Sequence, residues 1–200
     1  MGVLHDADVS ARGDLRQPLI AEQREILKHV VTEACVELLA AYSMPVGEVI
    51  EGDGPPRPSS IFGIIGFSGQ VQGSLTVVAS SELFGSTFPT MNGGRGTPSR
   101  PELLDWAGEI ANQTLGRIKR LFCRRGLDFD ASTPKVGDVG DLRALVGAEP
   151  LQGSTVGLVL TVSSGLMSVG FAVVPPVGGA LFEDEADAIP CAPEGDILLF

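Results

Sequence analysis

The sequence predicts an α+β domain in which a mainly antiparallel β-sheet carries two long helices packed on one face. Two long segments, 20–42 and 101–125, repeat their apolar residues at helical spacing. Short runs rich in β-branched residues lie between and after these segments, as is typical of strands. The last two runs are separated by Ser-Ser-Gly, which is a hairpin signal. This order of elements points to an α+β fold.

The first half of the chain yields its elements in order. We expect a helix over 20–42 with Pro18 at its start, because proline is tolerated in the first turn. A loop rich in proline and glycine follows at 51–60. Ser80 or Ser81 can cap a short helix. The elements expected here are two strands and that helix, at 61–68, 73–80 and 81–88.

The second half opens with a capping box, in which Ser99 caps the first turn of a helix and Glu102 reaches back to it. This helix is expected to run to about Arg125 and to stop at Gly126. A strand at 134–139 and an acidic connection follow. The two strands of the hairpin are expected at 155–162 and 166–174.

We expect one domain over 18–176, between a polar leader at 1–17 and an acidic tail at 177–200. The leader is expected to be mobile, and it lacks the apolar segment of a signal peptide. Most of the tail is expected to be loop. Its end, Ile197-Leu198-Leu199-Phe200, favours a final edge strand over a short apolar docking peptide.

Composition excludes several classes of function. Of the 200 residues 44% are hydrophobic and 20% charged, as in a globular domain. With 14 basic and 25 acidic residues the net charge is -11, which argues against nucleic-acid binding and against an anionic-membrane surface. No apolar run reaches the ~18–20 residues that span a bilayer. With only two histidines, histidine-based catalysis and zinc chemistry are not expected.

The three cysteines, Cys35, Cys123 and Cys191, are widely spaced and odd in number. This usage indicates reduced thiols and a cytoplasmic protein. Cys35 lies on the apolar face of the first helix and is expected in the core. Trp106 flanks the apolar side of the second helix, and packing is favoured over recognition as its role.

The second long helix carries the clearest functional signal. At ~100° per residue, its apolar residues gather on one side, while Asp105, Glu109, Asn112 and Gly116 lie together on the opposite side. Glu109 and Asn112 are neighbours at i and i+3. A glycine inside a helix costs about 0.8–1 kcal/mol relative to alanine. Gly116 therefore suggests a low point on this face that a partner's backbone can approach.

The segment DWAGEIANQTLG resembles the signature helix of the CheX/CheC-type chemotaxis phosphatases, in which Glu-x-x-Asn is followed by a glycine four residues on. Here those positions are Glu109, Asn112 and Gly116. The resemblance extends over about residues 20–175 and implies a CheC-like fold. The single Glu-x-x-Asn is similar to that of CheX-like members, since the first helix has no second copy.

The resemblance implies a phosphatase that hydrolyses the aspartyl phosphate of a CheY-type receiver domain. Asn112 would orient the attacking water and Glu109 would pair with a receiver lysine, because phosphoryl transfer depends on positioning and electrostatics. Asp105 and Gly116 would contribute to docking. The receiver would supply Mg²⁺, so this chain needs no cofactor or metal of its own. The resemblance also implies a homodimer through edge strands.

Several alternatives stay open at this point. The domain can be a catalytically silent module that docks a signalling partner, or a structural protein related to the flagellar switch. Asp105 is explained more simply by the helix dipole than by docking. The basic residues near the helix end either complement the dipole or attract an acidic receiver, and the first is favoured: Arg117, Lys119, Arg120, Arg124 and Arg125. Gln113-Thr114-Leu115 departs from the apolar, Met-rich stretch of the family and puts the identity of the partner in doubt.

Overall fold

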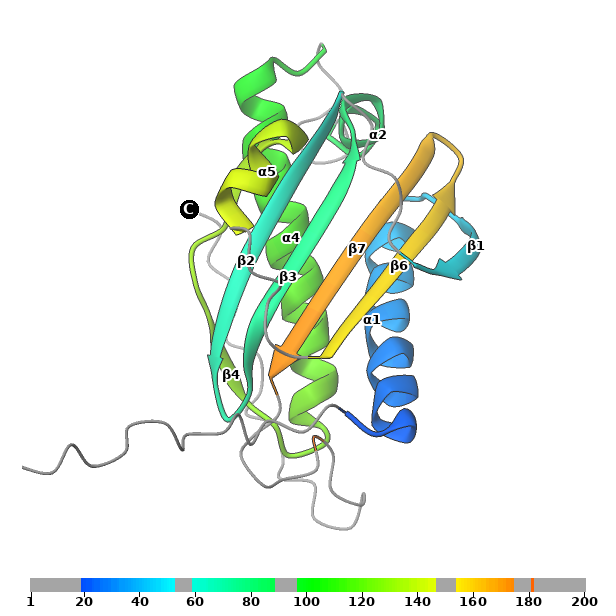
Figure 1. The fold of residues 1–200 in the computed structure, drawn as a ribbon. Helices are drawn as coiled ribbons and strands as arrows, with labels where there is room; N and C mark the ends of the chain where they lie inside the picture. The colour runs from blue at the N-terminus through cyan, green and yellow to red at the C-terminus, as the bar shows by residue number, and fades with distance from the viewer. Residues whose placement is uncertain (1–18, 53–58, 89–96, 147–153, 175–180, 182–200) are drawn as a thin grey trace, which may run out of the picture.

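A computed structural model describes residues 19–52, 59–88, 97–146, 154–174 and 181 (Figure 1). Its helices are α1 (Ala21–Ala41), α2 (Ser81–Thr87), α4 (Arg100–Cys123) and α5 (Val139–Val146). The strands are β1 (Val46–Glu51), β2 (Ser60–Gly69), β3 (Gln72–Ser80), β4 (Phe129–Ala131), β5 (Lys135–Asp138), β6 (Ser154–Val162) and β7 (Gly165–Val174).

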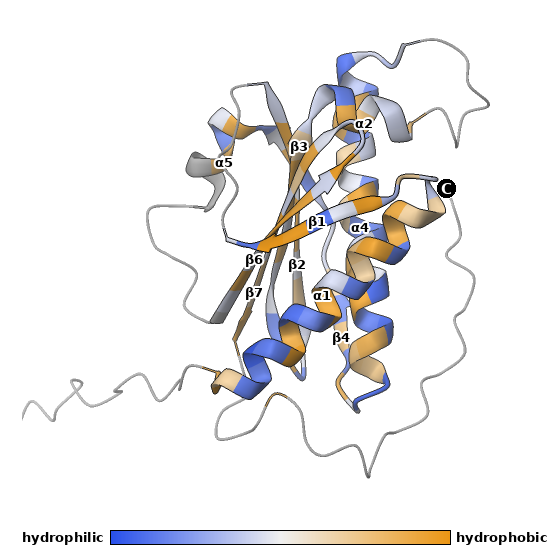
Figure 2. Ribbon diagram, turned by 90° about the vertical axis from the view of Figure 1, so that its right-hand side faces the viewer, coloured by the Kyte–Doolittle hydropathy of each residue, from blue (hydrophilic) through white to orange (hydrophobic). Residues whose placement is uncertain are grey.

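The seven strands form one sheet in the order β1-β6-β7-β3-β2-β4, and β5 also pairs with β2. Every pairing is antiparallel. The long helices α1 and α4 lie on one face of this sheet, and α5 lies on the other (Figures 1 and 2). The predicted fold class is therefore confirmed.

The helix α4 crosses β2 and β3 at close range, and glycine makes the approach possible. A Cβ on Gly63 of β2 would lie 2.4 Å from the Ala107 carbonyl oxygen of α4. A Cβ on Gly108 would lie 3.0 Å from Val136 Cγ1 and 3.5 Å from Pro134 Cβ. These contacts fix the rotation of α4 on the sheet, and so they decide which of its residues point outward.

The start of α4 has the predicted capping box. The Ser99 backbone N–H and its hydroxyl both donate to Glu102 Oε2, at 2.7 and 2.6 Å. The side-chain bond from Ser99 lowers the pKa of Glu102, and the backbone bond adds to this effect. The helix is thus anchored about two turns before Glu109, the first residue of the motif.

Three elements were not predicted, because their local patterns are weak. β1 has no strict alternation, and its register to β6 shifts between Val46 and Val49. β4 has three residues, and only Phe129 is buried. The acidic connection contains the helix α5, which begins with Val139-Gly140-Asp141.

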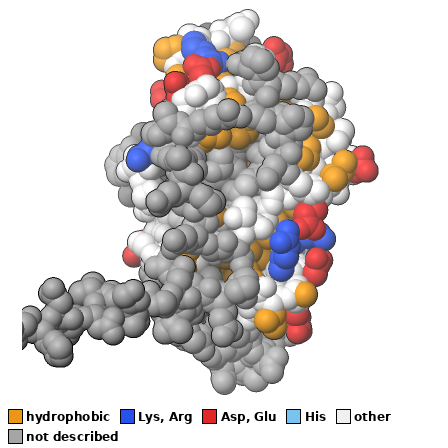
Figure 3. Space-filling model, viewed as in Figure 1, with side chains coloured by type: hydrophobic (Ala, Val, Ile, Leu, Met, Phe, Trp, Pro, Cys, Tyr) orange, Lys and Arg blue, Asp and Glu red, His pale blue; other side chains and the backbone are white. Residues whose placement is uncertain are grey.

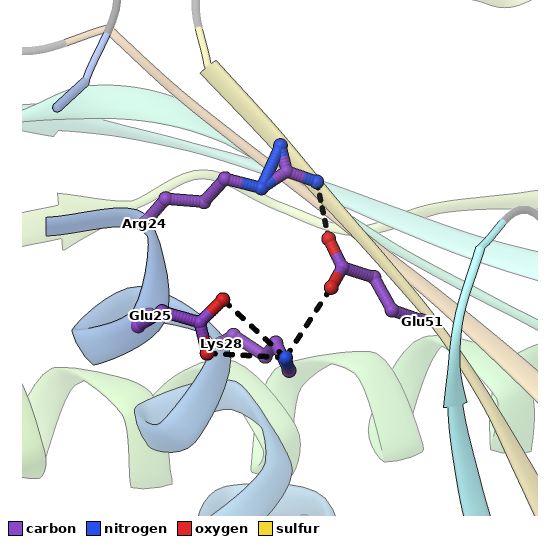
Figure 4. A network of polar contacts seen from close by, with 4 residues as sticks. All are labelled: Arg24, Glu25, Lys28 and Glu51. Atoms are coloured by element: carbon purple, nitrogen blue, oxygen red, sulfur yellow. Dashed lines mark hydrogen bonds and ion pairs between the residues drawn. The ribbon is translucent and has the colours of Figure 1, made fainter. Parts of the chain in front are cut away.

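Ion pairs join the edge strand β1 to α1 (Figure 4). Arg24 and Lys28 both bind the Glu51 carboxylate, Lys28 at 3.3 Å from Oε2. Lys28 also lies 3.1 Å from Glu25 Oε2. Figure 3 shows charged side chains of both signs gathered over α1. The Arg24 hydrogen bond, followed by the Lys28 bond, lowers the pKa of Glu51.

The core lies between the sheet and the two long helices. Cys35 and Trp106 are buried there, as predicted, with exposed fractions of 0% and 7%. Leu181 is also in the core, although it lies beyond the predicted domain boundary at 176. The predicted leader at 1–17 and the predicted terminal strand at 197–200 lie outside the described residues.

Candidate functional site

The outer face of α4 carries the four residues that the sequence singles out. Asp105 and Gly116 are exposed, and Glu109 and Asn112 are half-buried. All four sit on one continuous helix, with Glu109 and Asn112 neighbours one turn apart. The structure therefore brings together a carboxylate, a carboxamide and a glycine on one accessible surface.

Two other parts of the fold border this face. On one side Gly108 packs against Pro134 and Val136, the latter in β5. On the other side Gln113 meets Tyr42, which follows the end of α1. A partner that reaches Asn112 must therefore fit between α1 and the segment that leads into β5.

A chain of hydrogen bonds fixes the carboxylate of Glu109. The Tyr42 hydroxyl donates to Gln113 Oε1 at 2.7 Å, and Gln113 Nε2 donates to Glu109 Oε1 at 2.7 Å. Because Gln113 accepts with its oxygen and donates with its nitrogen, its amide has one orientation that satisfies both neighbours. No described residue forms a hydrogen bond with Glu109 Oε2, so this oxygen is available to a partner.

The sequence alone does not indicate that Tyr42 or Gln113 belongs to the site. The i,i+4 spacing of Glu109 and Gln113 was the only local signal of their contact, and such pairs are common on helices. Tyr42 lies 71 residues from Gln113, so their contact depends on the packing of α1 beside α4.

Asn112 differs from Glu109 in its contacts. Its carboxamide makes no hydrogen bond with any residue that the structure describes, although the side chain is half-buried. A carboxamide offers two N–H donors and one acceptor oxygen, and it does not titrate near neutral pH. Asn112 can therefore bind water or a partner without first breaking a bond to a described residue.

The surroundings of Tyr42 shift the pKa of its phenol. Burial raises the pKa of its phenol, and the negative charge of Glu109 raises it further. The hydrogen bond to Gln113 and the positive charge of Arg117 lower the same pKa. Arg117 is held nearby through a hydrogen bond from Nη1 to the Gln113 carbonyl oxygen at 3.2 Å.

Lys119 and Arg120, two members of the basic group near the end of α4, form ion pairs with described acidic residues of this chain. Lys119 Nζ lies 3.1 Å from Asp128 Oδ1 and 3.7 Å from Asp130 Oδ1. Arg120 pairs with Glu37 of α1. These pairs hold α4 to its neighbours and reduce the positive charge that is free to attract a receiver.

Asp105 lies beyond the first turn of α4, in which Glu102 is the acidic residue. The helix dipole acts mainly within the first turn. The dipole therefore gives a weaker explanation of Asp105 than the sequence analysis expected. Its exposed carboxylate remains on the face that carries Glu109 and Asn112.

Among the described residues, no group of three His, Cys, Asp or Glu side chains is arranged to hold a metal ion. In the same part of the chain, no helix is both long and apolar enough to cross a membrane.

The sheet order, the two helices on one face and the exposed Glu-x-x-Asn define a protein of CheC-like fold. Residues 61–150 match the family model of the chemotaxis phosphatase CheX. This range includes all of α4 and thus Glu109, Asn112 and Gly116. The resemblance predicted from the helix is confirmed over these residues, which are similar to CheX. No curated protein matches it.

Solved structures share the fold at low identity. The chemotaxis protein CheX from Vibrio vulnificus is 22% identical, with a TM-score of 0.58, over 75% of this chain and 97% of that one. A chain of the CheX–CheY–BeF3–Mg²⁺ complex from Borrelia burgdorferi is 14% identical, with a TM-score of 0.56, over 73% and 96%. FliY from Thermotoga maritima is 14% identical, with a TM-score of 0.52, over 82% and 94%.

Proposed function

We propose that this protein is a phosphatase that hydrolyses the aspartyl phosphate of a CheY-type receiver domain. The observation that carries the proposal is the outer face of α4, where Glu109 is held by Gln113 and lies one turn from Asn112, whose carboxamide bonds to no described residue. The CheX match over residues 61–150 supports it. So does the solved complex in which a CheX of the same fold is bound to CheY with BeF3 and Mg²⁺.

Asn112 orients the attacking water in this proposal. An acyl phosphate in a receiver already has a Mg²⁺ ion and a lysine around it, so the phosphatase has to supply a water in line with phosphorus. The Asn112 oxygen accepts from that water while the amide nitrogen donates toward the phosphoryl oxygens. Misplacing the water by about an ångström lowers the rate on the order of 10²-fold.

Glu109 docks the receiver. Its Oε1 is held by Gln113, and Oε2 faces the partner to pair with the receiver lysine. This pair fixes the register of α4 over the phosphorylated site. Asp105 adds a second carboxylate to the docking face, and Gly116 lets the receiver backbone approach. The Mg²⁺ ion is the receiver's, and the reaction takes place in the cytoplasm.

The test is the rate of phosphate loss from a phosphorylated CheY-type receiver with Mg²⁺, measured with and without this protein. Wild type is expected to accelerate the loss. Asn112→Ala is expected to lower kcat on the order of 10²-fold. Glu109→Ala is expected to raise KM. Glu22→Ala, which removes an exposed carboxylate from the first turn of α1, is the matched control and should act like wild type.

Two other results of this assay would contradict the phosphatase proposal and support a different function. If the receiver binds through α4 but loses phosphate no faster, the protein is a binding module. If several receivers from the same cell neither bind nor react, a structural role like that of the flagellar switch proteins takes its place.

A further inference from the structure

We propose that Gln113 is a positioning residue, which holds the Glu109 carboxylate in the orientation that docks the receiver and is itself held by Tyr42. This inference rests on the proposed function and deepens it. Gln113 does not touch the substrate. It acts through Glu109, and its side chain links the docking residue on α4 to the end of α1.

The geometry shows why Glu109 needs such a residue. A glutamate on an exposed helix face has three rotatable side-chain torsions, and ordering them on docking costs conformational entropy. The 2.7 Å bond from Gln113 Nε2 restricts the carboxylate before the partner arrives. Restriction of this kind improves binding because less freedom is lost in the complex.

The orientation of Gln113 is itself determined by Tyr42. Gln113 is half-buried, and its oxygen accepts from the Tyr42 hydroxyl at 2.7 Å. Tyr42 is 9% exposed, and its ring packs edge-on against Trp106 at 5.6 Å between ring centroids. A buried ring has little freedom to move, so its hydroxyl is a fixed donor. With the amide oxygen turned to Tyr42, the amide nitrogen must point to Glu109.

The arrangement predicts that losing Gln113 affects docking more than chemistry. Asn112 makes no hydrogen bond with Gln113, so the water that it orients is not disturbed directly. We expect Gln113→Leu to raise KM about tenfold, since hydrogen bonds to charged groups have about this effect. The kcat should stay within about twofold. Tyr42→Phe should raise KM by a smaller factor, because Gln113 keeps its bond to Glu109.

The experiment measures KM and kcat for a phosphorylated CheY-type receiver with wild type, Gln113→Leu, Tyr42→Phe, Glu109→Ala and the double variant Glu109→Ala/Gln113→Leu. If Gln113 acts through Glu109, Gln113→Leu has no further effect once Glu109 is gone. Gln70→Leu is the matched control. Gln70 also uses its side chain in a hydrogen bond, from the Asp128 backbone N–H, but away from α4's outer face.

A second readout does not need turnover. Tyr42 is the only tyrosine of the chain, so phenolate absorbance reports its ionisation alone. Glu109→Gln should lower the pKa of Tyr42, since a charge that raises it is removed. A Tyr42 pKa that stays unchanged in Glu109→Gln would show that the Glu109 carboxylate is not held beside Tyr42, and would overturn the proposal.

The kinetic outcomes separate this inference from the proposed function. A tenfold rise in KM that disappears in the Glu109→Ala background supports positioning. An unchanged KM, or an equal loss of kcat in both backgrounds, overturns it. If wild type does not speed phosphate loss, the phosphatase proposal fails, and Kd for a receiver loaded with BeF3 and Mg²⁺ replaces KM. Weaker binding by Gln113→Leu then still supports positioning, and no binding by wild type overturns both.

Discussion

The Tyr42 ring meets the Trp106 indole edge-on, with ring centroids 5.6 Å apart and planes inclined at 79°. This contact joins the end of α1 to α4, next to the Gln113 bond. Trp106 is also fixed at its polar end, where its Nε1 donates to Thr87 Oγ1 of α2 at 2.7 Å. One buried aromatic pair therefore holds the helices that border the proposed docking face.

The variant Tyr42→Phe tests the contribution of the hydroxyl to stability apart from that of the ring. The variant keeps the edge-on packing with Trp106 and loses the bond to Gln113, so it should lower the free energy of unfolding by about 0.5–1.5 kcal/mol. Tyr42→Ala also removes the ring and should cost about 3–5 kcal/mol. Urea unfolding followed by the fluorescence of Trp106, the only tryptophan, measures both. Equal losses in the two variants would show that the ring contact contributes nothing.

Gly116 should have opposite effects on stability and on docking. A Cβ at this position would meet nothing within 4 Å, so Gly116→Ala introduces no clash in the free protein. The variant should raise the free energy of unfolding by up to about 1 kcal/mol through helix propensity. It should also weaken receiver binding, because the added methyl group lies where the partner's backbone approaches.

Gly85→Ala in α2 is the matched control for Gly116→Ala. Its Cβ would also meet nothing within 4 Å, and it lies off α4. Both variants should be stabilised in urea, and only Gly116→Ala should bind the receiver more weakly. If Gly116→Ala bound the receiver as tightly as wild type, Gly116 would not be part of the docking face.

The face of α4 was predictable from sequence because it belongs to one continuous helix. Helical periodicity alone places Asp105, Glu109, Asn112 and Gly116 together, and the capping box fixes where the helix begins. Strands β2, β3, β6 and β7 were also predictable, since each has a run of β-branched residues and two pairs are joined by short turns.

The parts of the fold and of the site that the sequence did not predict depend on contacts between residues that are distant in the chain. β1 is an edge strand that pairs with β6 and is bound to α1 by Glu51, and neither relation leaves a local pattern. Gln113 was noticed only as a departure from the family. Its role requires Tyr42, 71 residues earlier, and one sequence does not show that α1 and α4 meet there.

Cys35 should be inert in the folded protein. It is fully buried, and burial raises the pKa of its thiol to about 12. Because the thiolate is the reactive species, a disulfide reagent near pH 8 should modify Cys35 only after unfolding. Cys123, which is partly exposed, should react in the native state. Mass spectrometry of the labelled peptides separates the two sites, and rapid labelling of native Cys35 would contradict its burial.

The burial of Cys35 also predicts how the stability of the protein changes at alkaline pH. The folded protein favours the protonated thiol, whereas the unfolded chain ionises Cys35 near the ordinary thiol pKa of 9.0. This contribution to stability is therefore fully present below about pH 9 and is lost as the pH rises toward about 12. Cys35→Ala should lose less stability between these pH values than wild type, as urea unfolding at each pH would measure.

The ion pairs of Glu51 predict a loss of stability at acidic pH, in contrast to the loss at alkaline pH that is expected from Cys35. Its pKa is lowered by the hydrogen bonds from Arg24 and Lys28, so the folded protein favours the carboxylate. The stabilisation is present above the ordinary glutamate pKa of 4.5 and is lost as the pH falls through the lower folded value. Salt should weaken it as well, because the ion pairs are exposed to solvent.

Glu51→Gln and Glu48→Gln test this effect on the same strand. Both side chains belong to β1, but Glu48 forms no ion pair with a described residue. At neutral pH and low salt, Glu51→Gln should unfold at a lower urea concentration than Glu48→Gln. The difference should shrink below about pH 4 and in about 1 M salt, where charge is removed or screened. A difference that persists under both conditions would mean that Glu51 stabilises β1 by packing, and not by the ion pairs that join it to α1.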